Sequence, residues 1–169
     1  MKNTPASKIA FGGVMAALAL VIMNMFGLIP VATYACPSLV IILLSVVLRL
    51  CGRRIGWAWY GAVAILSALL APDKEAAAIF VVLGYYPMLK PVFEKTRMPN
   101  TCKYLYFNAV ILVTYWLLIN LMGLTEIAKE FAEMGMLFVA VTLLMGNMIF
   151  QMLDKILTRI ATTNKWGRK

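Results

Sequence analysis

Six long, predominantly apolar stretches alternate with short charged segments along the 169 residues of this chain. A run of about 20 apolar residues is long enough to cross the hydrocarbon core of a bilayer as a helix. Hydrophobic residues make up 63% of the sequence, against roughly 45–50% in soluble domains. We therefore predict an all-α integral membrane protein, a single compact bundle over residues 1–169, with spans at about residues 9–26, 31–50, 55–72, 76–89, 104–124 and 134–157.

The charges between these stretches predict a topology. Of the 16 Lys and Arg residues, 14 lie in or beside the two terminal segments and the second and fourth connections. Five of the seven acids lie in the third and fifth connections, together with Lys74 and Lys129. Because short segments rich in Lys and Arg stay cytoplasmic, we predict six transmembrane helices in a cell membrane, with both termini cytoplasmic and the acidic connections outside.

Two local features modify this prediction. Pro37 is expected to delay regular helix in the second span until about Ser38. The fourth stretch, Ala76–Leu89, has 14 uncharged residues, which rise only about 21 Å as a helix against a hydrocarbon core of about 30 Å. If it did not cross, the cation-rich segment after it would lie outside with the acids. We therefore interpret it as a short or partly recessed span rather than a re-entrant one, and as a hint of a hollow at the outer side.

Several chemistries are not indicated by the sequence. The chain has no His, no phosphate-binding loop, no nucleophile elbow and no zinc-binding helix motif. The uncharged part of each stretch lacks the ionisable groups that intramembrane catalysis and ion coupling use. We expect no enzyme, no cofactor, no metal site and no self-powered carrier. The cations are spread over four segments, which favours membrane lipid over nucleic acid as their partner.

Small residues and aromatic residues suggest contacts with other helices. The pairs Gly12/Ala16 and Gly13/Ala17 let helix backbones approach closely, either within the bundle or against a partner. Tyr85 and Tyr86 are interpreted as interfacial belt residues, with anchoring of a partner as the alternative. The fifth connection, at about residues 125–133, has an amphipathic pattern that would either cap a hollow or simply join two spans.

The size, the predicted topology, the opening segment Lys8–Val21 and the following Ile29-Pro30 together resemble the substrate-binding S components of energy-coupling-factor (ECF) transporters. The resemblance implies a bacterial ABC importer subunit that captures a vitamin-like solute or related micronutrient at the extracellular side. It also implies a transmembrane coupling subunit and its ATPases as partners. The small residues of the first span would dock onto that subunit, namely Gly12, Gly13, Ala16 and Ala17.

The same resemblance implies a ligand site near the outer face, between the later helices and under the first connection. Its candidate residues are Asn24, Tyr34, Asp73, Lys74, Glu75, Tyr115, Asn120 and Glu126. These residues match no signature for thiamine, riboflavin, biotin or folate, and the missing His residues argue against nickel and cobalt. Two other functions stay open: a membrane scaffold or assembly protein resembling rod-shape membrane proteins, and, more remotely, a passive facilitator.

Overall fold

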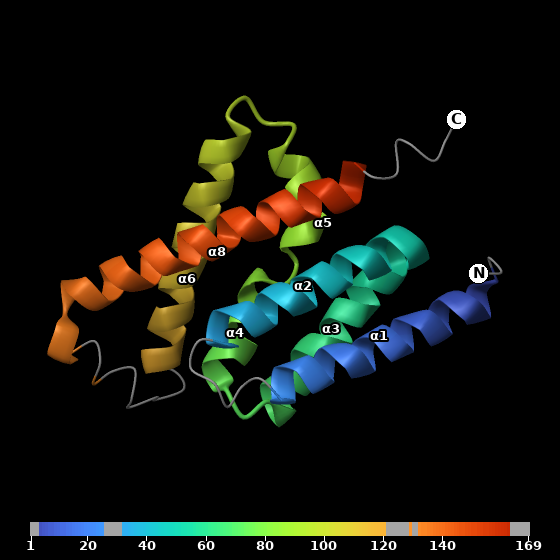
Figure 1. Ribbon diagram of the computed structural model, residues 1–169, viewed down its shortest axis with the longest axis horizontal. Coiled ribbons are helices and arrows are strands. Elements are labelled where there is room, and N and C mark those ends of the chain that lie inside the picture. Colours follow the sequence, from blue (N-terminus) through green and yellow to red (C-terminus); the bar gives the residue numbers. More distant parts are fainter. Residues whose placement is uncertain (1–3, 26–31, 121–128, 130–131, 163–169) are drawn as a thin grey trace.

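The computed structural model describes every residue outside 1–3, 26–31, 121–128, 130–131 and 163–169, and within the described residues all regular elements are helices (Figure 1). The prediction of an all-helical chain is confirmed. The helices are α1 (Pro5–Met25), α2 (Ala32–Cys51), α3 (Arg53–Leu70), α4 (Lys74–Leu83), α5 (Tyr86–Phe93), α6 (Pro99–Asn120) and α8 (Met136–Thr162).

Five helical segments are long and apolar enough to cross a membrane: Pro5–Asn24, Thr33–Cys51, Lys74–Phe93, Pro99–Asn120 and Val139–Thr162. They correspond to five of the six predicted spans. The counterpart of the third predicted span is α3, which begins with Arg53 and Arg54 and is not among the five. Large apolar side chains on these segments are exposed, such as Val14 and Leu105 at 67% and 70%. Such surfaces are compatible with contact with lipid.

The second helix begins earlier than predicted. It starts at Ala32 and runs through Pro37 without interruption, so the expectation that helix begins near Ser38 is wrong. The proline ring removes only one hydrogen bond, to the Thr33 carbonyl, close to the helix start where the backbone can adjust. The Ser38 hydroxyl donates to the Tyr34 carbonyl at 2.8 Å, which adds a local contact beside the proline.

The predicted short fourth span is corrected in length. The apolar helical segment runs from Lys74 to Phe93, 20 residues, and is divided into α4 and α5. Pro87 lacks the N–H that would bond to the Leu83 carbonyl, which explains the break. The segment includes two lysines that the prediction placed in the connections, and both have partners: Lys74 donates to α3 carbonyls, and Lys90 is paired with Asp154.

Helix α2 lies at the centre of the packing and contacts α1, α3, α4 and α8 (Figure 1). Its inner face is fully buried at Val40, Ile41, Leu44 and Val47, the spacing of one helical stripe. Helix α3 approaches α2 closely at Gly56, where a Cβ atom would come within 2.2 Å of Leu48 Cδ2. Because α2 packs against helices on several sides, it is the central helix of the bundle.

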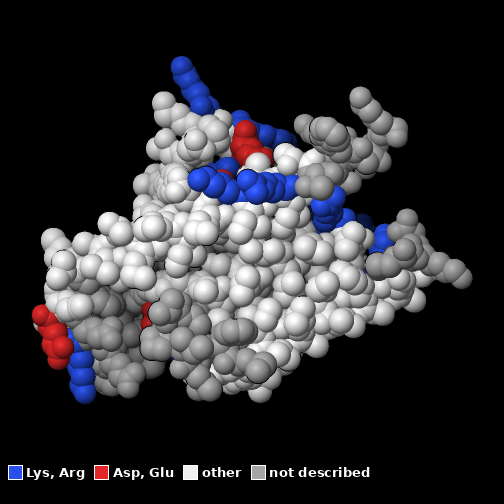
Figure 2. Space-filling view, in the orientation of Figure 1, with Lys and Arg blue, Asp and Glu red and all other residues white. Residues whose placement is uncertain are grey.

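The charged residues separate toward the two ends of the helices. Figure 2 shows Lys and Arg gathered along one rim of the molecule. Arg49 at the end of α2 and Lys90 in α5 belong to the cation-rich end. Asp73 and Glu75 stand at the start of α4, at the opposite end. The turn between α2 and α3 at the cation-rich end is tight because Gly52 adopts φ 94°.

Candidate functional site

Three helices bring polar side chains together at the cation-poor end of the bundle. Thr33 and Tyr34 come from the first turn of α2, Asp73 and Glu75 from the start of α4, and Tyr115 from the last third of α6. We call these five residues the Tyr–Glu cluster. Tyr115 is 9% exposed, and the other four are half-buried. Four of them are among the predicted ligand residues.

One carboxylate oxygen organises the cluster. Glu75 Oε1 accepts from the Tyr115 hydroxyl at 2.5 Å and from the Tyr34 hydroxyl at 3.3 Å. The two tyrosine hydroxyl oxygens also lie within hydrogen-bonding distance of each other, and because each hydroxyl has one proton, the three contacts share two protons. Hydrogen bonds to an ionised acceptor are roughly twice as strong as neutral ones. The arrangement therefore holds α2, α4 and α6 in one geometry at this end.

Asp73 fixes the position from which Glu75 reaches the tyrosines. Its Oδ1 accepts from the Ala76 backbone N–H at 3.0 Å, which is an N-cap of α4. Its Oδ2 accepts from the Thr33 hydroxyl at 2.9 Å. A side-chain cap of this kind stabilises a helix start by about 1 kcal/mol. Because the Asp73 carboxylate both caps α4 and accepts a hydrogen bond from α2, it holds the starts of these two helices next to each other.

An apolar cavity of about 310 Å³ adjoins the cluster between α6 and α8. Tyr115 forms part of both, and Trp116, Asn120 and Thr142 also line the cavity. Its volume is at the lower end of the range for small-molecule sites. An aromatic wall with a few polar atoms and a neighbouring carboxylate can hold the apolar body of a small solute and orient its polar or cationic group.

Three of the other predicted ligand residues, Asn24, Lys74 and Asn120, do not join the cluster. Asn24 donates to Leu20 O of its own helix at 2.8 Å. The Lys74 ammonium donates to the carbonyls of Ala68 and Leu69 at the end of α3. Asn120 lines the cavity, but its amide donates to Trp116 O. Glu126 lies outside the described residues, as does most of the fifth connection.

Sequence reasoning missed two hydroxyl residues of this region. Thr33 bonds to Asp73, and Thr142 of α8 interacts with the Tyr34 hydroxyl and lines the cavity. Thr33 is adjacent to Tyr34 in the sequence, so its place at the helix start was available as a signal. Thr142 is one of few hydroxyl residues in an apolar stretch, and a survey of hydroxyls as well as amides would have found it.

The predicted docking residues divide between two faces of α1. Gly12 is buried, and its carbonyl accepts from Trp59 Nε1 at 3.0 Å. Ala16 is half-buried and packs against the core. Gly13 and Ala17 are exposed, and a Cβ atom at Gly13 would meet nothing within 4 Å. One pair of small residues thus packs within the chain, and the other faces outward.

A second polar cluster, which sequence reasoning did not find, lies at the cation-rich end. Lys90 and Lys103 are 5% and 6% exposed, and both form ion pairs with Asp154, at 2.5 and 3.2 Å. Asp154 also accepts from the Tyr86 hydroxyl at 2.7 Å, and Thr158 accepts from Lys90 at 2.6 Å. We call these five residues the Asp154 network. Tyr86 is fully buried within it, so its assignment to an interfacial belt is wrong.

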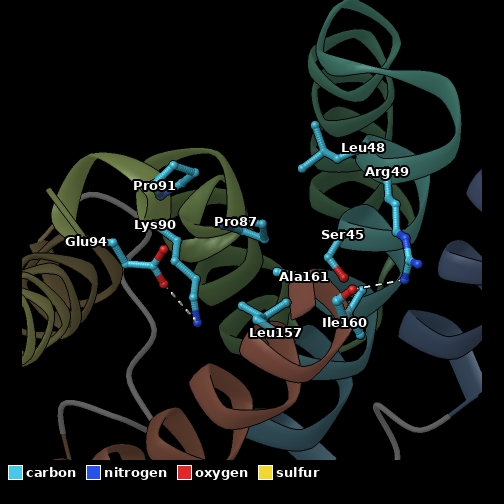
Figure 3. Close-up of a pocket in the computed structure, with 10 residues that line it drawn as sticks. All are labelled: Ser45, Leu48, Arg49, Pro87, Lys90, Pro91, Glu94, Leu157, Ile160 and Ala161. Atoms are coloured by element: carbon cyan, nitrogen blue, oxygen red, sulfur yellow. Dashed lines mark hydrogen bonds and ion pairs between the residues drawn. The ribbon is translucent and has the colours of Figure 1, made fainter. Parts of the chain in front are cut away.

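A groove of about 270 Å³ runs beside this network between α2, α5 and α8. Figure 3 shows Lys90 and Glu94 on one side of it and Arg49 on the other, with the Arg49 guanidinium directed at the Ile160 carbonyl, 2.9 Å away. The Glu94 side chain is 48% exposed, and its Oε1 lies 3.9 Å from the Lys90 ammonium nitrogen. The network therefore links α5, α6 and α8 through buried charges.

Among the described residues, no three Cys, Asp or Glu side chains lie close enough together to hold a metal ion. No family model, curated protein or solved structure matches this chain.

Proposed function

We propose that the chain is a six-span membrane protein with both termini cytoplasmic, and that it captures a small solute at the extracellular side as the substrate-binding subunit of an ECF-type importer. The observation that carries the proposal is the Tyr–Glu cluster beside an apolar cavity. The cluster joins residues from three helices that are distant in sequence. It lies at the cation-poor end, which the positive-inside rule assigns to the outside.

The residues suit recognition rather than chemistry. The Glu75 carboxylate and the two tyrosine hydroxyl oxygens offer acceptors to a polar or cationic group, and the rings of Tyr115 and Trp116 offer apolar surface. A solute in the cavity would contact Tyr115 and would alter the contact between α2, α4 and α6. Occupancy of the cavity is thereby linked to the geometry of the bundle.

The exposed small residues on α1 support a membrane partner. Gly13 and Ala17 lie on one outward face, with Val14 beside them at 67% exposure. Small residues at this spacing allow close helix packing in lipid. In the proposed complex, this face contacts a coupling subunit, and ATPases bound to that subunit supply the energy.

The test is retention of a small molecule by the purified protein, read by mass spectrometry after gentle extraction. We expect the wild type to retain a solute, and Tyr115→Phe and Glu75→Gln to reduce retention about tenfold, the effect of losing a hydrogen bond to a charged group. Tyr104→Phe, in the same helix as Tyr115 but in the wall of a different cavity, is the matched control and should retain the solute.

The outcome also separates the alternatives. If no solute is retained and no coupling subunit co-purifies, the proposal fails. If no solute is retained but a membrane protein is recovered through the Gly13 and Ala17 face, the scaffold function is favoured instead. That assignment requires that Gly13→Leu abolish the recovery while Gly61→Leu, in open space on α3, does not.

A further inference from the structure

Two cavities flank the Asp154 network, and they differ in electrostatic character. The groove in Figure 3 has the final turns of α2 and α8 in its walls, at Arg49 and Ile160. Carbonyl groups at helix C-termini carry partial negative charge. The Lys90 ammonium already donates to Asp154 Oδ1, the Asp154 carbonyl and Thr158. This groove therefore offers little to an anion.

The second cavity, of about 180 Å³, lies between the first turns of α6 and the second half of α8. The cavity is lined by the Phe150 ring and by the Asp154 carboxylate, which is paired with Lys90 and Lys103. The rest of the wall is formed by five side chains that can donate hydrogen bonds, those of Asn100, Lys103, Tyr104, Gln151 and Lys155. The N-terminal end of the 22-residue helix α6 adds partial positive charge. Donors and positive potential thus converge on one small cavity.

The charges around this cavity leave an excess of one cation. Lys90, Lys103 and Lys155 face two carboxylates, Asp154 and Glu94. Lys103 donates only to the two oxygens of Asp154, at 3.4 and 3.2 Å, which leaves one of its three N–H groups without a hydrogen-bond acceptor among the described residues. A single phosphodiester would neutralise the excess and accept from that group.

An apolar stripe leads away from the cavity along α8. Going back from Lys155 toward the start of α8, Gln151, Met148 and Leu144 lie three or four positions apart and so share one face of the helix. Met148 and Leu144 are 63% and 64% exposed. The stripe runs from the cation-rich rim toward the middle of the helix, the direction that an acyl chain takes below its headgroup.

We propose that this cavity binds the phosphate of an anionic phospholipid, with Lys103 and Lys155 on the phosphate and an acyl chain along Met148 and Leu144. The site rests on the membrane location in the proposed function and is independent of the solute. Basic pockets between helices at the cytoplasmic face are typical sites for anionic headgroups. The lipid would bridge α6 and α8 at the end where the Asp154 network already joins them.

The experiment measures binding of phosphatidylglycerol and of phosphatidylcholine to the detergent-purified full chain by native mass spectrometry. We expect phosphatidylglycerol to bind the wild type with the higher affinity. Lys155 is exposed, so Lys155→Gln should fold normally and weaken this binding about fivefold. Lys95→Gln, an exposed cation that is not part of the cavity wall, is the matched control and should leave the affinity unchanged.

Three results would overturn the site. Equal affinity for the two lipids removes the need for an anion, and equal weakening by Lys95→Gln and Lys155→Gln assigns the effect to general surface charge. Inorganic phosphate that displaces the lipid at equal concentration assigns the cavity to free phosphate. Solute retention is measured on the same preparation, so failure of the lipid site and failure of the proposed transport function are read separately.

Discussion

At the residue scale, Asp154 joins α5, α6 and α8 through its side chain. Its carboxylate lies between two lysines that are almost fully buried. Asp154→Asn leaves those two cations without their main counter-charge. Breaking a buried ion pair by removing one partner costs roughly 3–5 kcal/mol, and we expect about 3 kcal/mol because the Asp154 side chain keeps 23% exposure. The free energy of unfolding in detergent, from denaturant titration followed by circular dichroism, measures the loss.

Glu94→Gln is the matched control, because it makes the same carboxylate-to-amide change in a side chain that is 48% exposed and 3.8–3.9 Å from the lysines. Such pairs contribute about 0–1 kcal/mol. An equal loss of stability in the two variants would contradict the central place of Asp154. This pairing was not predictable from periodicity, because Lys90 and Asp154 are 64 positions apart and helical periodicity relates only residues within one helix.

At the scale of elements, Gly84 at the break between α4 and α5 lies close to both α4 and α3. A Cβ atom at Gly84 would lie 2.4 Å from the Phe80 carbonyl oxygen and 2.9 Å from Tyr60 Cε2. Gly84→Ala should therefore destabilise the fold by about 1–3 kcal/mol, the usual cost of overpacking. Gly61→Ala, where a Cβ atom meets nothing within 4 Å, should be neutral or stabilising. Thermal unfolding of the two variants provides the comparison, and equal melting temperatures would refute the close approach.

Helix positions followed from the sequence better than helix contacts did. Apolar runs predicted where the spans containing α1 and α2 begin to within a few residues, because burial in lipid or protein demands such runs. The exception was the expected delay of regular helix after Pro37. Tyr34, Asp73, Glu75 and Tyr115 were grouped because the resemblance to S components implies a ligand site near the outer face of the predicted bundle. Thr33 joins them only through its bond to Asp73. That contact depends on how α2 and α4 are rotated about their axes, which a charge pattern does not encode.

For the whole molecule, the number of crossings depends on α3. With its two arginines at the start, α3 is less apolar than the five segments long and apolar enough to span. If α3 crosses, four crossings separate Thr4 from Lys95 and place both on the cytoplasmic side. If it does not, the number is odd and the two residues lie on opposite sides. The orientation of Glu133 relative to Lys95 follows from α6 alone.

Cysteine labelling of intact cells measures this topology. The free thiols Cys36, Cys51 and Cys102 are first replaced by Ser or Ala, and Thr4→Cys, Lys95→Cys and Glu133→Cys are introduced singly at exposed positions. We expect a membrane-impermeant maleimide to label Glu133→Cys in intact cells, and to label Thr4→Cys and Lys95→Cys only after lysis. Labelling of Lys95→Cys in intact cells, with Thr4→Cys protected, would mean that α3 does not cross. The start of α6, and with it the phospholipid cavity, would then lie on the outer side of the membrane, the reverse of what the lipid proposal requires.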